Sequence, residues 1–246
     1  SISGYGLVAN QVGLLKTAFE KLNDADELST STGTSSDTTA ISLTSVIGSA
    51  DTGAYDIAVS QLAQDQRMIS DEYAATTSTL NASSFNISIV VGNTSTTTTA
   101  VTVTTPTPAG VVAAINAAST GVTASLVDTG ISGTNYRIIL SGPTGSEGAF
   151  TMSSTPDLGF GDSGNTLQAA QNSVINFDGL TVTRSSNEIS DVIEGVTMSL
   201  TETTSSAVRL NIVSDKTTLK TNLQNVVTAY NTLNTLFTEL TTKATE

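Results

Sequence analysis

The C-terminal end of the chain carries the most regular pattern of apolar positions. Large apolar residues recur there every three or four residues, at Leu219, Leu223, Val226, Tyr230, Leu233, Phe237 and Leu240. This heptad stripe predicts a helix with one apolar face. Residues 215–242 contain neither Gly nor Pro, and Ser214 or Asp215 can cap the first turn. We therefore predict one helix from Asp215 to about Thr242.

A stripe of the same kind occurs near the N-terminus. It consists of Tyr5, Val8, Val12, Leu15, Phe19 and Leu22. Because Thr and Asn, which are weak helix formers, surround the C-terminal stripe, that helix should depend on a partner. We predict that the two helices pack stripe against stripe and that the residues between them are inserted at one end of a helical leg. The alternative is that each stripe packs on a sheet of its own.

Between the two helices the pattern changes to alternation of apolar and polar residues. This period of two predicts half-buried strands at 55–59, 85–89, 101–103 and 136–140. Asp178-Gly179 lies between two further alternating runs and predicts a tight type I′ hairpin.

Three further elements are expected between the helices. Residues 196–202 and 208–214 are predicted to form a second hairpin, and residues 108–118 a short helix. The Ser/Thr-rich stretch 29–39 is interpreted as a surface loop.

Composition removes several classes of function. The chain has 9 basic and 22 acidic residues, a formal net charge of −13, which disfavours nucleic acids and anionic membrane surfaces as partners. It contains no Cys and no His, so disulfides, Ser-His and Cys-His catalysis and His-zinc chemistry are excluded. No apolar run approaches the length of a membrane-spanning helix. We expect no cofactor and no membrane insertion.

Hydroxyl side chains take the place of charges along most of the chain. There are 44 Thr and 32 Ser among 246 residues, while only 13% of residues are charged. Such a neutral polar surface suits display and assembly, because neighbouring subunits do not repel each other strongly.

Two groups of oxygen-bearing residues are candidates for chemistry. Glu188, Asp191 and Glu194 are spaced so that a helical turn would gather them for acid/base work or calcium binding, although a solvated helix face is the favoured interpretation. The loop residues Asp157, Asp162 and Asn165 could bind a cation, but a Gly-rich turn is favoured. We therefore predict no catalytic residue and no metal site.

A long ordered run in the second half of the chain resembles a known family. INFDGLTVTRSSNEISDVIEGVTMSL, followed by VRLNIVSD and NLQNVVTAYNTLNTL, is similar to the bacterial flagellar filament-capping family, hook-associated protein 2. The stretch that begins GVVAAINAAST also resembles the flagellin-hook IN motif. The main positions that match the family pattern are Asp178, Gly179, Arg184, Asn187, Asp191 and Gly195.

The resemblance implies an α+β fold, with a helical coiled-coil-like leg and two inserted, mostly antiparallel β domains. It implies that the leg occupies residues 1–45 and 214–246, a middle β domain 46–83 and 169–213, and a tip β domain 84–168. Because the terminal segments of the family are missing, we expect the chain to be a core fragment.

The resemblance also implies a function without catalysis. Cap subunits form a homo-oligomeric ring on the distal end of the flagellar filament, promote flagellin folding and insertion, and prevent flagellin loss. The expected location is extracellular, at the filament tip, after export by the flagellar secretion system. The alternative is a surface adhesin whose tip β domain binds mucin or host glycans.

Overall fold

The structure of the chain, a computed structural model, describes residues 2–23 and 31–242. Its helices within those ranges are α1 (Ile2–Glu20), α3 (Pro108–Ala117), α4 (Lys216–Thr242) and the 3-10 helix η1 (Ser146–Gly148). Its strands are β1 (Ser31–Ser35), β2 (Ile41–Val46), β3 (Gly53–Gln61), β4 (Asp65–Ile69), β5 (Phe85–Val91), β6 (Thr99–Val103), β7 (Thr123–Asp128), β8 (Tyr136–Thr144), β9 (Phe150–Ser154), β10 (Thr166–Gln168), β11 (Ser173–Phe177), β12 (Leu180–Arg184), β13 (Glu188–Ile189), β14 (Val196–Leu200) and β15 (Val208–Ser214). Helices and several antiparallel sheets together make an α+β fold.

The chain divides into two compact units. Unit 1 comprises residues 1–56, 188–199 and 208–246, and unit 2 comprises residues 57–187 and 200–207. Both units are discontinuous in sequence, because the chain leaves unit 1 within β3 and returns to it later. The finer division into leg, middle and tip domains remains a prediction.

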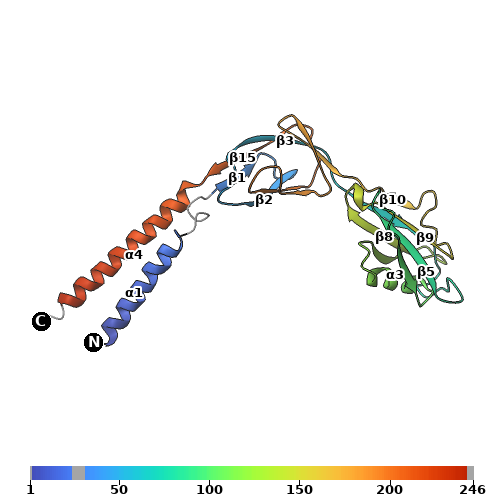
Figure 1. Ribbon diagram of the computed structural model, residues 1–246, viewed down its shortest axis with the longest axis horizontal. Helices are drawn as coiled ribbons and strands as arrows, with labels where there is room; N and C mark the ends of the chain where they lie inside the picture. The colour runs from blue at the N-terminus through green and yellow to red at the C-terminus, as the bar shows by residue number, and fades with distance from the viewer. Residues whose placement is uncertain (1, 24–30, 243–246) are drawn as a thin grey trace. The chain divides into compact units, whose positions relative to one another are not determined.

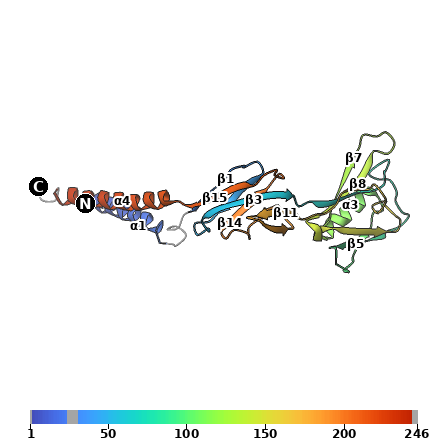
Figure 2. The ribbon, with the colours of Figure 1, turned by 90° about the horizontal axis from the view of Figure 1, so that it is seen from above.

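Unit 1 contains the two terminal helices and two groups of strands. α1 and α4 lie side by side and run antiparallel, so that the two chain ends are at the same end of the pair (Figures 1 and 2). The predicted contact between the terminal helices is therefore confirmed. β1 pairs antiparallel with β15 from Ser31↔Ser214 to Ser35↔Leu210, and β13, β14 and β2 form a second sheet in that order.

Unit 2 has a core between two sheets and α3. One sheet has the order β10-β4-β8-β7 and the other β6-β5-β9, and α3 contacts β6, β7 and β8. Thr107 caps α3 by accepting a hydrogen bond from the Gly110 amide, and Pro108 suits the first turn. The core is built from aliphatic residues and three Phe rings: Met68, Phe85, Ile87, Ile89, Val101, Val103, Val111, Ile115, Val122, Ala124, Ile138, Leu140, Phe150, Leu158 and Phe160.

The alternating patterns identified strands but not always their partners. The strands predicted at 55–59, 85–89, 101–103 and 136–140 and the helix predicted at 108–118 are confirmed. The hairpin predicted between 196–202 and 208–214 is wrong, because β14 lies between β13 and β2 whereas β15 lies between β1 and β3. Both strands bury alternate residues, and this alternation alone does not select a partner.

The interpretation of 29–39 as a loop is wrong for residues 31–35, which form β1; residues 29 and 30 lie outside the described ranges. Thr favours extended backbone, and Gly33 allows close packing, since a Cβ atom there would collide with side chains of Leu43 and Ile212. The hydroxyl-rich stretch therefore covers an apolar face as an edge strand. None of the helices in the described ranges has the length and apolar character needed to cross a membrane.

Candidate functional site

The contact between α1 and α4, the helix pair, follows one line of residues on each helix. The inward-facing positions at least partly shielded from solvent on the N-terminal side are Gly4, Val8, Gln11, Leu15, Ala18 and Leu22. Those on α4 are Leu219, Asn222, Val226, Ala229, Leu233, Leu236 and Leu240. Their spacing of three and four residues is that of a helix packed against one neighbour. The Asn222 amide also donates a hydrogen bond to the Lys21 carbonyl oxygen, 3.4 Å away.

The structure places the predicted stripe residues in two groups. The inward group contains Val8, Leu15, Leu22, Leu219, Val226, Leu233 and Leu240. The exposed group contains Tyr5, Val12, Phe19, Leu223, Tyr230 and Phe237, which are 46% to 81% exposed. Small or polar residues such as Gln11 and Ala18 take the inward positions next to them. The apolar surface of each helix is thus wider than one neighbouring helix covers.

The first turn of α4 is held by the carboxylate of Asp215. Its oxygens accept hydrogen bonds from the Thr217 amide at 2.8 Å and the Thr218 hydroxyl at 2.7 Å. The hydrogen bond from Thr218, followed by that from the Thr217 amide, lowers the pKa of Asp215. Asp215 is therefore the N-cap, one of the two residues that the sequence suggested for this position.

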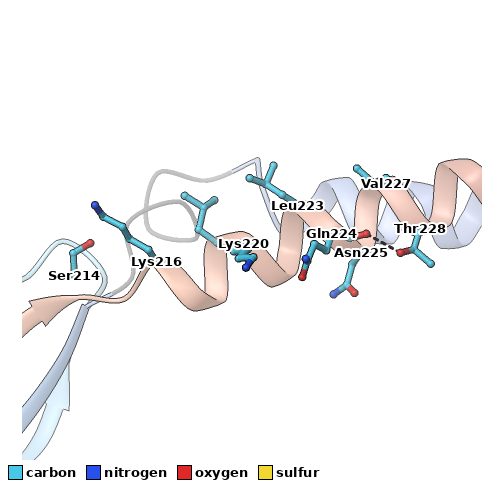
Figure 3. Close-up of a pocket in the computed structure, with 9 residues that line it drawn as sticks. Ser214, Lys216, Lys220, Leu223, Gln224, Asn225, Val227 and Thr228 are labelled. Atoms are coloured by element: carbon cyan, nitrogen blue, oxygen red, sulfur yellow. Dashed lines mark hydrogen bonds between the residues drawn. The ribbon is translucent and has the colours of Figure 1, made fainter.

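A groove runs along the first half of α4. It has a volume of about 930 Å³ and is lined by both apolar and basic side chains, among them Leu219, Leu223, Val227, Lys216 and Lys220 (Figure 3). The predicted stripe located the leucines of this groove. The sequence reasoning treated the two lysines only as solvated surface residues.

The family-pattern positions Asp178 and Gly179 form the tip of the β11–β12 hairpin. Asn176 faces Thr181 and Phe177 faces Leu180, which leaves a two-residue turn. Both turn residues have positive φ, +46° at Asp178 and +91° at Gly179, as a type I′ turn requires. The Gly179 amide donates a hydrogen bond to the Asn176 side-chain oxygen at 2.9 Å. The predicted hairpin is confirmed, and these two residues shape a turn.

Asn187 joins two distant parts of unit 2 through its side-chain amide. Its oxygen accepts a hydrogen bond from the Ala63 amide at 2.7 Å, and its nitrogen donates to the Ala63 carbonyl at 2.9 Å. The backbone carbonyl of Asn187 accepts a further hydrogen bond from the Leu200 amide. A side chain that satisfies both backbone groups of one residue fixes the position of that segment. Sequence reasoning found Asn187 only through the family pattern.

Two other family-pattern positions have structural surroundings. Arg184 donates a hydrogen bond to the Thr183 carbonyl, while its own carbonyl accepts one from the buried Ser173 hydroxyl. Gly195 has a φ of +74°, and a Cβ atom there would lie 2.7 Å from Ile47 and 2.8 Å from the Ala50 backbone. Only glycine combines this backbone conformation with so close an approach.

The carboxylates of Glu188, Asp191 and Glu194 are not arranged on a helix. Glu188 lies on β13, where it faces Ser199, and residues 190–195 form bends and turns. The helical spacing on which the acid/base and calcium hypotheses depended is therefore absent. Within residues 2–23 and 31–242, no group of three or more Asp or Glu residues is placed to hold a metal ion.

The loop that contains Asp157 and Asn165 is organised by protein donors. The Arg137 guanidinium donates to the Asn165 side-chain oxygen at 3.1 Å and to the Ser70 carbonyl at 2.9 Å. Asp157 accepts a hydrogen bond from the Gly159 amide at 3.0 Å. The arginine thus supplies positive charge at this loop, which explains its oxygen-rich sequence without a bound cation. Sequence reasoning missed Arg137, because 28 residues separate it from Asn165.

The structure thus describes paired helices and antiparallel sheets whose patterned residues shape turns, caps and strand junctions, as in proteins that act by assembly. The family models for the N-terminus and C-terminus of flagellar hook-associated protein 2 match residues 1–66 and 170–246. The chain belongs to the flagellar hook-associated protein 2 family.

Relatives and solved structures agree along the chain. Flagellar hook-associated protein 2 of Escherichia coli K12 is 32% identical over 98% of this chain and 53% of its own length. The D1-D2-D3 domains of the E. coli flagellar cap protein FliD match with a TM-score of 0.83 at 28% identity, over 98% of this chain and 70% of that one. FliD (HAP2) of Pseudomonas aeruginosa PAO1 matches with a TM-score of 0.67 at 27% identity, over 82% and 97%. The chain spans about half the length of the E. coli relative.

Proposed function

We propose that this chain forms part of a cap at the distal end of the bacterial flagellar filament. In this role it promotes flagellin folding and insertion and prevents flagellin loss. The single observation that carries the proposal is the continuous match to a flagellar cap structure over 98% of the chain with a TM-score of 0.83. The matches to both family models, one at each end of the chain, support it.

The described residues fit a role in binding better than a role in bond chemistry. The family is one of structural cap proteins, and the candidate acidic groups are held in turns or by Arg137. The sheets provide a rigid body, while the helix pair presents apolar side chains to solvent. The chain is therefore proposed to act by contact with other subunits and to perform no catalysis.

The proposed partners are flagellin and further copies of the cap protein. A homo-oligomeric ring at the filament tip, outside the cell and reached by flagellar export, is part of the proposal. The low charge content supports close packing of copies, since only 13% of residues are charged. The adhesin alternative, in which residues 84–168 bind mucin or host glycans, has no support from the relatives or from the solved structures.

Deletion of the gene that encodes this chain tests the proposal. We expect the mutant to release flagellin monomers into the medium and to grow short filaments or none, and a plasmid copy of the gene to restore filament length. Flagellin in the supernatant and filament length by electron microscopy are the two measurements. Normal filaments and no flagellin in the medium of the deletion strain would contradict the cap function.

A further inference from the structure

One side of the helix pair is apolar and uncovered. This side, the apolar face, consists of Tyr5, Val12, Phe19, Leu223, Tyr230 and Phe237. Each of these residues directly follows an inward-facing position, as Val12 follows Gln11 and Tyr230 follows Ala229. At about 100° per residue, one step from the inward position turns toward one flank of a helix. Because α1 and α4 run antiparallel, this step leads to the same flank of the pair in both helices (Figure 1).

The opposite side of the helix pair has a different composition. It carries Leu7 and Leu14 from α1, but its α4 positions are Asn225, Thr232 and Glu239. A groove of about 450 Å³ that contains Leu7, Thr232 and Glu239 in its lining joins the two helices on this side. This groove supports the assignment of sides. The apolar face is therefore a property of one flank, where both helices contribute an aromatic or aliphatic side chain every seven residues.

Positive charge gathers at one end of the apolar face. Lys216 lies seven residues before Leu223 on the same line of α4, Lys220 lies one turn further, and Lys16 lies beside Phe19. All three are near the end where α1 finishes and α4 begins, and no Asp or Glu occupies the corresponding lines. In contrast, residues 31–214 carry 15 Asp and Glu but only four Arg and no Lys. The apolar face is thus a basic exception in an acidic chain.

We propose that the apolar face binds one amphipathic helix with acidic residues at one end. The repeat of seven residues on both α1 and α4 matches the spacing at which a third helix places side chains in a groove between two helices. From Leu223 to Phe237 the face extends for about 21 Å at 1.5 Å per residue, so a partner helix of about 18 residues covers it with one turn beyond. The three lysines then face the acidic end of the partner.

The charge pattern favours this occupant over two others. A second copy of the chain would place the same basic, carboxylate-free face against the first, so its lysines would remain without opposite charges. A membrane of anionic lipid would satisfy the lysines, but the uncharged remainder of the face lies between two helices and is shaped as a groove for a helix. An acidic helix satisfies both the apolar groove and the lysines.

A binding measurement with a synthetic peptide tests the proposal. The probe is an 18-residue peptide with Leu at helical three- and four-residue spacing and three Glu at one end, labelled for fluorescence anisotropy. Two control peptides keep its length: one has the same composition in scrambled order, and the other has Lys in place of Glu. We expect the chain to bind the probe at least tenfold more tightly than either control.

Variants of the chain locate the binding site. Tyr230→Ser with Phe237→Ser should raise the dissociation constant of the probe by about tenfold or more, because two large apolar contacts are lost. Lys216→Glu with Lys220→Glu should raise it by about three- to tenfold, and added salt should reduce this effect. Leu7→Ser with Leu14→Ser is the matched control, since these leucines are similarly exposed on the opposite side, and it should leave binding unchanged. Circular dichroism checks that each variant keeps its helices.

Several outcomes would overturn the proposal. Equal weakening by the Leu7/Leu14 variant would place the site elsewhere, and equal binding of the Lys peptide would remove the role of charge. A chain that is dimeric without peptide, but monomeric with Tyr230→Ser and Phe237→Ser, would identify a second copy as the occupant. Preference for vesicles of anionic phospholipid over the probe would identify a membrane. None of these outcomes bears on the cap function, which the gene deletion tests separately.

Discussion

The helix pair and the core of unit 2 are stabilised to very different degrees. Side chains such as Ile87, Val111 and Leu140 are completely buried between the sheets and α3. In the described part of the helix pair, Leu233 is the large apolar residue that counts as buried, and it is still 9% exposed. Hydrophobic stabilisation follows the apolar area removed from water. The difference indicates a self-sufficient β core and a helix pair that gains stability from whatever covers its apolar face.

The sharpest test of this difference uses the same substitution in both regions. Leu140→Ala, in the fully buried core, should lower the free energy of unfolding by about 3–5 kcal/mol, near the upper end for such changes. Leu233→Ala, in the helix pair, should lower it by about 2 kcal/mol or less, because solvent already reaches this site. Urea denaturation followed by circular dichroism measures both. Equal losses would show that the helix pair is packed as tightly as the core.

A glycine substitution tests close packing within the β part of unit 1. Gly195→Ala combines a positive φ with overlap against Ile47 and Ala50, and overpacking adds about 1–3 kcal/mol to the backbone strain. Gly164→Ala is the control, because Gly164 has a φ of +93° and nothing within 4 Å of the added atom. The Gly195 variant should unfold at the lower temperature. If the two variants melt together, the close approach at Gly195 adds nothing.

The Asn187 amide provides a test of the junctions that hold unit 2. Asn187→Ala leaves both backbone groups of Ala63 without their partners, which should destabilise the protein by about 1–3 kcal/mol. Asn176→Ala removes one hydrogen bond at the exposed hairpin tip and should cost about 1 kcal/mol or less. Chemical denaturation of the two variants gives the comparison. A larger loss for Asn176→Ala would contradict the role assigned to Asn187.

The apolar periodicity of the sequence was sufficient for elements but not for all of their contacts. Seven-residue repeats located both terminal helices and their pairing. They did not separate inward from exposed positions, because Leu223 and Val226 are equally apolar while the neighbouring helix covers only one flank. Strand pairing of β14 and β15 was missed because alternation is the same for any partner. The Arg137 and Asn187 contacts join residues far apart in sequence, where no local pattern exists.

The smallest expected effect concerns the N-cap of α4. Because the pKa of Asp215 is lowered in the folded chain, its stabilisation is present above the unfolded pKa of about 3.9 and is lost as pH falls through the lowered value. Asp215→Asn should keep the cap at neutral pH, since Asn also caps helices well, and should abolish this loss. Asp215→Ala should weaken α4 at every pH. Helicity measured from pH 6 to pH 2 separates the three proteins.

Hydrogen exchange tests the contrast between the two regions most directly. Amides exchange through local opening wherever a segment is less stable than the whole protein. We predict that the amides of α4 exchange at least tenfold faster than those of β5 and β8 in the free chain, and that the acidic probe peptide slows exchange in α4 but not in those strands. Equal protection of α4, β5 and β8 in the free chain would contradict the account.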